Sequence, residues 1–393
     1  MRTITKNTAK INNLSAKNSP VRIGIVGGGQ LGRMLTLAAK KLGFYVLILD
    51  PTPQSPAGQV SDEQIVGDFK DEAAIRQLAQ KSDIVTFESE FINDKVLQEL
   101  LNEGKQVDPS PKTLTIIKDK LRQKEYLKTH GIPTADFIEV ETKKDIIAAS
   151  ENFGYPLLLK ARFDAYDGKG NAVIHTEDEI QQGMEKLHGK KLYVEQYVPF
   201  IKELAVMVIR DRQGNVTSYP IVETMHKDNI CDVVLAPPRV SETAKKNAAA
   251  LANKTVQYLE GAGIFGIEMF CKKDDNVLVN EIAPRVHNSG HYTIEASKTS
   301  QFEQHIRAIA GLPLGETTMA VKAVAMKNIL GQRHGPGTPL GLDKATALPN
   351  VSLHMYGKKE SRVGRKMGHI TVIGENVEEC LDKAEKARNM III

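Results

Sequence analysis

The chain contains no tryptophan and few aromatic residues or cysteines. Aromatic residues make up 5% of its 393 positions, and there are three cysteines. Cys231, Cys271 and Cys380 are far apart, odd in number and without the spacing of a metal-ligand set, so they predict no disulfide framework. We therefore expect a protein of a reducing compartment and assign it to the cytoplasm.

Long apolar runs and a strong charge imbalance are also missing. No run approaches the roughly 18 apolar residues that a membrane-spanning helix needs. The first twenty residues are rich in Lys, Asn, Ser and Thr and lack the apolar core of a secretory signal, so residues 1–20 are predicted to be a disordered tail. A net charge of +4 argues against an electrostatic nucleic-acid binder. We expect small-molecule partners, with neither a membrane nor a nucleic acid among them.

What the chain does have is the composition of a globular protein: 41% hydrophobic and 25% charged residues. Its length exceeds one ordinary hydrophobic core, which favours two or three domains. The first domain opens with a βαβ pattern in which the strand 21–26 leads through the glycine turn 27–32 into a helix, and a second strand, 44–49, ends at Asp50. Further strands, 84–87 among them, alternate with helices to about residue 111 and predict an open, mostly parallel sheet.

The glycine turn alone suggests a dinucleotide site with Asp50 as the ribose acid. That signal is weak. A glycine turn of this kind implies only that N–H groups at a helix N-terminus face an anion or another polar group.

The middle of the chain has a mixed α+β pattern. A helix is predicted over 118–130 and a short apolar strand over 156–160, which ends in Lys160. This lysine is either a surface residue or a phosphate ligand. The polar loop 164–171, with two glycines around Lys169, is either a hairpin turn or a mobile cover whose N–H groups wrap phosphate oxygens. Further strands are predicted over 172–174, 192–195, 203–210 and 216–224, and helices over 177–187 and 242–261.

The most informative stretch is the hairpin that joins the strand 264–270 to 277–281. If the hairpin is symmetric about residues 274 and 275, Glu268 and Glu281 lie opposite each other on one face, roughly 5 Å apart. Two carboxylates that close repel unless a cation separates them, and hard oxygen ligands suit Mg²⁺. The alternative is a solvated hairpin with two surface acids, but apolar residues surround both.

A third region begins after Pro313. Strands are predicted over 321–329 and 351–356, and an amphipathic helix over 377–388. The segment 356–369 carries five cations interleaved with three glycines. It is either a solvated face or a phosphate clamp.

Five motifs make the chain resemble the ATP-grasp superfamily, and within it the N5-carboxyaminoimidazole ribonucleotide synthetase family. The motifs are Gly27–Met34, Tyr166–Gly170, Asn280–His291, Thr299–His305 and Gly364–His369. The likeness runs from about residue 21 to residue 373. It implies a Rossmann-like pre-ATP-grasp domain over 21–117, an ATP-grasp domain over 118–313 with a lid at about 133–198, and a small β-rich C-terminal domain over 314–393.

The resemblance implies a role for each position that matches a family motif. ATP contacts are implied for Lys120, Lys160, Ala165, Tyr166, Asp167, Gly168, Lys169, Gly170, Asn171, Glu195, Gln196, Tyr197, Val198, Glu203, His226, Asn280 and Glu281. Glu268 and Glu281 would hold Mg²⁺ or Mn²⁺. A catalytic role around bicarbonate and carboxyphosphate is implied for Arg285, His287, Asn288 and Lys358, with Asp167 as an alternative to His287 for moving the amine proton. The ribonucleotide acceptor would be contacted by Gln30, Glu88, Tyr166 and Arg365.

The implied reaction is ATP- and bicarbonate-dependent carboxylation of aminoimidazole ribonucleotide, by a homodimer. The chain offers cations, a metal site and loops in place of an activated Ser or Cys nucleophile, as phosphoryl transfer requires. Three alternatives stay open from the residues: a formate-using ATP-grasp transformylase, a non-catalytic nucleotide-binding regulator, and a nicotinamide dehydrogenase. The last leaves the acid pair and the basic segment unexplained.

Overall fold

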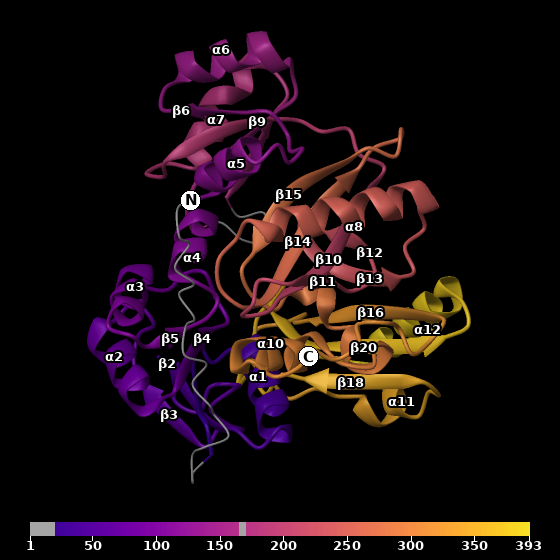
Figure 1. The fold of residues 1–393 in the computed structure, drawn as a ribbon. Coiled ribbons are helices and arrows are strands. Elements are labelled where there is room, and N and C mark those ends of the chain that lie inside the picture. The colour runs from indigo at the N-terminus through magenta and orange to yellow at the C-terminus, as the bar shows by residue number, and fades with distance from the viewer. Residues whose placement is uncertain (1–19, 165–169) are drawn as a thin grey trace, which may run out of the picture.

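The computed structural model describes residues 20–164 and 170–393 (Figure 1). Of the expected tail over 1–20, only Pro20 falls within this part of the chain. Three groups of elements are visible in Figure 1: α1 to α4 with the first sheet, a small upper layer around α6 and α7, and a large β-rich body.

The first sheet is parallel and has the strand order β3-β2-β1-β4-β5. Its elements are β1 (Arg22–Val26), α1 (Gln30–Lys41), β2 (Tyr45–Asp50), β3 (Glu63–Val66), α2 (Glu72–Lys81), β4 (Ile84–Phe87), α3 (Asp94–Asn102) and β5 (Gln106–Val107). Ile75 and Leu78 of α2 pack with Leu47 and Val85 of the sheet. The predicted open parallel sheet is confirmed.

Two helices connect this unit to the next. The helix predicted over 118–130 is α5 (Lys120–Thr129), and a second helix that was not predicted, α4 (Pro111–Lys118), precedes it. Asp119 separates them because its backbone is extended and its carboxylate accepts the Leu121 N–H at 3.1 Å, which caps α5. The same carboxylate binds Arg162 at 2.6 Å, so this junction is tied to the small layer above it.

The small layer has the strand order β6-β9-β7-β8 and lies where the lid was expected. Its elements are β6 (Phe137–Val140), α6 (Lys143–Phe153), β7 (Leu157–Ala161), β8 (Asn171–Ile174), η2 (Glu177–Glu179), α7 (Ile180–Lys186) and β9 (Leu192–Gln196). Ile146 of α6 packs on Leu157, Leu159 and Val194.

A nine-stranded sheet forms the large body, with the order β15-β14-β10-β12-β13-β16-β20-β18 and β11 paired beside β10. Its strands are β10 (Lys202–Arg210), β11 (Val216–Ser218), β12 (Val222–Lys227), β13 (Ile230–Ala236), β14 (Gly263–Cys271), β15 (Val277–Ala283), β16 (Ala323–Leu330), β18 (Val351–Met355) and β20 (Lys366–Gly374). The predicted single strand over 216–224 is two strands, because Pro220 between them has no N–H to donate to the ladder. Since β13 pairs with β16, one sheet continues across the expected boundary after residue 313.

The two faces of this sheet have different roles. Helix α8 (Glu242–Gln257) buries Ala244, Ala248 and Ala252 against the face that carries Leu204 and Val206. Side chains alternate between faces along a strand, so Glu203 and Ala205 point away from α8. Ala205 pairs with Glu268, which places the acidic residues on the face opposite α8.

The remaining elements lie in the C-terminal part of the chain, and most of them are short. They are η3 (Asn288–Gly290), α9 (Thr293–Ala296), α10 (Gln301–Ala310), β17 (Gly335–Pro336), α11 (Leu342–Thr346), β19 (Glu360–Ser361) and α12 (Val377–Asn389). Among the described residues, no helix has the length and apolar character that crossing a membrane requires.

Candidate functional site

The predicted acid pair is present on the β14–β15 ribbon. Glu268 is the register partner of Glu281, as predicted, although the hairpin is not symmetric as assumed. Near the turn, Met269 pairs with Val279, a register that would set Glu268 opposite Asn280. A β-bulge between Glu268 and Met269 shifts the pairing by one residue and brings the two carboxylates face to face.

The oxygen atoms at this position fit a divalent cation. Burial, followed by repulsion from Glu281, raises the pKa of Glu268 to about 7. The Oδ1 atom of Asn280 is buried with no hydrogen-bond partner among the described residues. Two facing carboxylates and an orphaned amide oxygen are the hard donors that Mg²⁺ prefers. Within the described chain, no three His, Cys, Asp or Glu side chains form a metal-binding group, so the protein offers two carboxylates and this amide oxygen.

Cations and histidine surround the acid pair. The Lys120 ammonium contacts the Glu281 carboxylate, and Nε2 of His287 lies 3.4 Å from Oε1 of Glu268. Burial, followed by the nearby Arg285 charge, lowers the pKa of His287 to about 3, so its imidazole is neutral at pH 7. The acids are therefore half-buried among charged and polar side chains, which argues against the alternative of a solvated surface hairpin.

A second charge cluster holds the predicted phosphate lysine Lys160. Its side chain is buried, which rules out a surface residue, and its Nζ lies 3.3 Å from Oε1 of Glu195. Lys124 reaches the same oxygen at 3.1 Å, and the Tyr193 hydroxyl donates to it at 3.1 Å. Burial would raise the pKa of Glu195, but the charges of Lys124 and Lys160 outweigh burial and lower it. Glu195 was predicted as an ATP contact; its side chain here anchors two lysines.

Two further predicted ATP contacts, Glu203 and His226, also lie together. Nδ1 of His226 on β12 is 2.8 Å from Oε2 of Glu203 on the neighbouring β10. Burial works against the charged imidazole, but the hydrogen bond and charge of Glu203 outweigh it and raise the pKa of His226. Three more predicted ATP contacts lie at the end of β9: Gln196, its last residue, and Tyr197 are exposed, and Val198 is buried.

Arg285 is fixed by a residue that the sequence analysis did not single out. Its Nε and Nη2 donate to the two carboxylate oxygens of Glu90 at 2.6 and 3.0 Å, and its Nη1 donates to the Val286 carbonyl at 3.2 Å. An arginine has five N–H donors, so two, one on each terminal nitrogen, take no acceptor among the described residues. These two N–H groups can bind an oxyanion. Glu90 comes from the loop after β4 and was missed because its partner is 195 positions away.

The glycine turn is occupied by the protein's own carboxylates. Glu88 accepts the N–H groups of Gly29 and Gly32 at the start of α1, and Asp50 accepts the N–H of Gly28 at 2.9 Å. These carboxylates take three of the N–H groups that a pyrophosphate would need, so the structure does not support the dinucleotide interpretation. Gln30, the first residue of α1, stays a predicted acceptor contact, as does Glu88.

The cationic segment 356–369 is partly loop and partly strand. It becomes β20 at Lys366, and His369 is fully buried, so it is not simply a solvated face. Lys358 Nζ donates to the Lys366 carbonyl at 2.7 Å, and Arg365 Nη1 donates to the Glu360 carbonyl at 2.7 Å. One hydrogen bond ties the segment to the first domain: Gln59 donates to the Gly357 carbonyl at 2.8 Å. Within the first domain, Arg33 donates to the same Gln59 side chain at 3.2 Å.

Five predicted residues of the phosphate cover lie outside the described residues: Ala165, Tyr166, Asp167, Gly168 and Lys169. Of the rest of that loop, Gly170 accepts the Ala161 N–H at 2.8 Å, and Asn171 is the register partner of Lys160.

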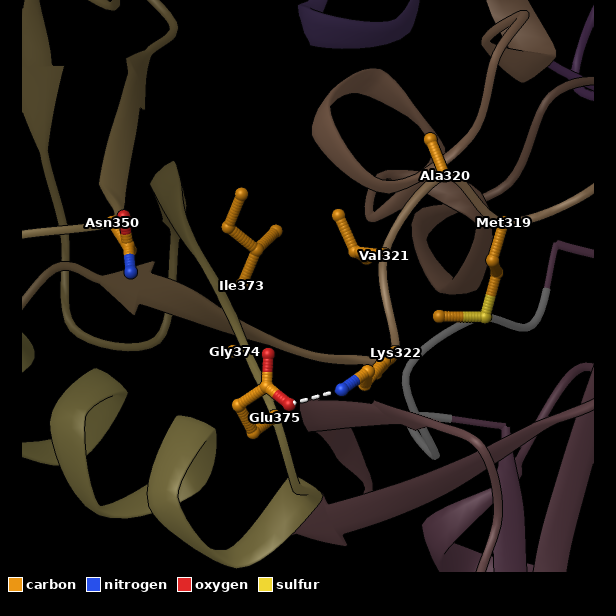
Figure 2. Close-up of a pocket in the computed structure, with 8 residues that line it drawn as sticks. All are labelled: Met319, Ala320, Val321, Lys322, Asn350, Ile373, Gly374 and Glu375. Atoms are coloured by element: carbon orange, nitrogen blue, oxygen red, sulfur yellow. Dashed lines mark hydrogen bonds and ion pairs between the residues drawn. The ribbon is translucent and has the colours of Figure 1, made fainter.

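A cavity of about 500 Å³ lies elsewhere, next to the start of β16 and the end of β20 (Figure 2). Met319, Val321 and Ile373 form its apolar side, and Lys322 pairs with Glu375 at 2.5 Å. None of the predicted site residues lines it.

Comparison with known proteins agrees with this arrangement. Residues 21–118 match the ribonucleotide synthetase preATP-grasp domain, residues 125–302 the ATP-grasp domain, and residues 324–383 the phosphoribosylaminoimidazole carboxylase C-terminal domain. Together, these three domain matches identify the chain as an ATP-grasp ligase.

Similarity to individual proteins of known structure identifies the family within the ATP-grasp ligases. The structure of N5-carboxyaminoimidazole ribonucleotide synthetase from Thermotoga maritima is 48% identical over 95% of this chain and 99% of that one, with a TM-score of 0.86. That of N5-carboxyaminoimidazole synthase from Aspergillus clavatus, in complex with ADP and 5-aminoimidazole ribonucleotide, is 39% identical over 94% of this chain and 98% of that one, with a TM-score of 0.88. The chain belongs to the N5-carboxyaminoimidazole ribonucleotide synthase family.

Some relatives are longer. Phosphoribosylaminoimidazole carboxylase from Ogataea methanolica is 44% identical over 91% of this chain, and the match covers 67% of that protein. The chain thus spans about two thirds of the length of such fungal relatives.

Proposed function

We propose that this chain uses ATP and bicarbonate to carboxylate the exocyclic amine of 5-aminoimidazole ribonucleotide, giving N5-carboxyaminoimidazole ribonucleotide for purine biosynthesis. The observation that carries the proposal is the Glu268–Glu281 pair, which Lys120 and His287 contact and with which the Arg285 charge interacts. The relative from Aspergillus clavatus, whose structure holds ADP and the aminoimidazole ribonucleotide, supports the choice of substrates.

The first step forms carboxyphosphate. An oxygen of bicarbonate attacks the γ-phosphorus of ATP, the bond from that phosphorus to the bridging oxygen breaks, and ADP leaves. Lys160 and Lys120 lie among the acids that would otherwise repel the triphosphate, and the two remaining N–H donors of Arg285 would bind the transferred group. Such positioned charge is the main source of catalysis in phosphoryl transfer. Mg²⁺ or Mn²⁺, held by Glu268, Glu281 and Asn280, supplies positive charge against the phosphate oxygens when bound.

The second step forms the carbon–nitrogen bond. Carboxyphosphate releases phosphate and CO₂, the amine nitrogen bonds to the carbon of CO₂, and one amine proton leaves. His287, whose imidazole is neutral and borders the acid pair, and Asp167 are the two candidates for accepting that proton. Arg365, near the contact between the cationic segment and the first domain, is assigned to the ribonucleotide. The same resemblance supports a homodimer, which sedimentation would test.

ADP release tests the proposal when each substrate is left out in turn. We expect ADP release to require bicarbonate and to accompany consumption of aminoimidazole ribonucleotide in equal amounts. ADP release with formate in place of bicarbonate would instead identify a formate-using transformylase. A folded, ATP-binding chain that releases no ADP with every substrate present would be a nucleotide-binding regulator.

A further inference from the structure

Asn288 follows His287, whose imidazole borders Glu268, and its side chain is held by the buried side chain of Asn328. Asn288 begins η3, directly after His287, and Asn328 lies on β16, 40 positions further along the chain. The two amides bond reciprocally: Asn328 Nδ2 donates to Asn288 Oδ1 at 2.6 Å, and Asn288 Nδ2 donates to Asn328 Oδ1 at 3.1 Å. Asn288 is 8% exposed and Asn328 1%.

A third contact fixes which way both amides face. Asn328 Nδ2 also donates to the main-chain carbonyl of Cys231 at 2.7 Å. The β13–β16 ladder ends at the pair Val233–Lys327, so β16 offers this carbonyl no main-chain donor, and the side chain takes its place. A carbonyl can only accept, so the nitrogen of Asn328 must face Cys231, and its oxygen must face the Asn288 amide.

The orientation of the Asn328 amide determines that of Asn288. Its oxygen must accept the second N–H of Asn328, and its nitrogen must donate to the oxygen of Asn328. One N–H of Asn288 then takes no acceptor among the described residues and is left for a ligand. An amide turned by 180° would fill the same space and present oxygen in place of nitrogen, which would repel an anion.

We infer that Asn328 is a positioning residue that fixes the Asn288 amide with its N–H toward bicarbonate and the carboxyphosphate formed from it. This inference rests on the proposed function. Asn328 touches no substrate and acts through Asn288, so its loss should affect the use of bicarbonate and leave ATP binding intact.

The test is Asn328→Asp, which keeps the shape of the side chain and replaces both N–H donors by an oxygen. In CO₂-depleted buffer, we expect kcat/KM for bicarbonate to fall about tenfold or more, the range typical of lost outer-shell contacts, with KM for ATP within about twofold of wild type. In an Asn288→Ala background the same substitution should have no further effect, because the two residues act as one unit.

Lys327→Met is the matched control. Lys327 is the neighbour of Asn328 on β16, and its side chain pairs with Asp232 and Glu385 at 2.8 and 2.7 Å. We expect Lys327→Met to lower the thermal midpoint and to leave KM for bicarbonate unchanged. ADP binding by calorimetry checks that each variant is folded. If Asn328→Asp fails this check, Asn328→Ser, which cannot span to Asn288, is measured in its place.

Two results separate this inference from the proposed function. If Asn288→Ala raises KM for bicarbonate and Asn328→Asp does not, the positioning role is overturned and the proposed function stands. If Asn288→Ala leaves bicarbonate kinetics unchanged, the assignment of Asn288 within the proposed function fails, and the inference fails with it.

Discussion

Replacing Glu90 by glutamine should destabilise the protein strongly, because Glu90 joins the first domain to Arg285 through a buried, two-point ion pair. The two side chains are 8% and 16% exposed. Burial would raise the pKa of Glu90, but the Arg285 charge outweighs it and lowers the pKa from its ordinary 4.5 to about 2. That difference in pKa corresponds to ~3 kcal/mol of unfolding free energy. Removing one partner of a buried ion pair typically costs a similar amount, roughly 3–5 kcal/mol.

The pH dependence has a defined sign. A carboxyl whose pKa is lowered by folding contributes its full stability above about pH 4.5 and loses it as the pH falls toward 2. We therefore expect Glu90→Gln to lose about 3 kcal/mol of unfolding free energy at pH 7, and the gap to wild type to shrink below pH 4.5. The chain has no tryptophan, so urea unfolding is followed by circular dichroism.

Glu260→Gln is the control for this experiment. Glu260 pairs with Lys112 of α4 at 3.0 Å and also links the first domain to the large body, but both side chains are more than half exposed. Its loss should cost less than about 1 kcal/mol. Equal losses in the two variants, or a loss under about 1 kcal/mol for Glu90→Gln, would refute the reasoning.

Three further substitutions test the site. Glu281→Gln should abolish ADP release in a folded protein, because it removes half of the acid pair; near-normal release, measured with a coupled ADP assay, would contradict the metal assignment. Arg365→Ala should raise KM for aminoimidazole ribonucleotide more than KM for ATP in steady-state kinetics; a change in ATP affinity alone would assign the cationic segment to the nucleotide. Lys124→Met should lower the thermal midpoint and raise KM for ATP several-fold, because Glu195 then attracts Lys160 without sharing its charge with a second lysine; unchanged ATP kinetics would leave Lys124 a purely structural residue.

Local patterns predicted much of the fold. The strand over 84–87 is β4, and the glycine turn leads into α1 as expected, because these elements depend on residues close together in sequence. The opposed glutamates were predicted from hairpin symmetry, but the true register reaches the same result through a bulge that no local pattern indicated. The strands β13 and β20 were not predicted, and their place beside β16 depends on pairing over long sequence distances.

The residues missed at the site share one property: each supports a predicted residue from a distant part of the chain. Glu90 binds Arg285 across 195 positions, and Asn328 binds Asn288 across 40. Lys124 could have been found, because it lies four residues after Lys120 and therefore on the same face of α5.

The central claim is that a divalent cation binds between Glu268 and Glu281 beside the nucleotide. A crystal structure of the protein with ADP and Mn²⁺ tests it most directly, because manganese is located by its anomalous scattering. We predict an anomalous peak within bonding distance of both carboxylates and of a phosphate oxygen. A peak that neither glutamate touches, with ADP bound elsewhere, would contradict the account.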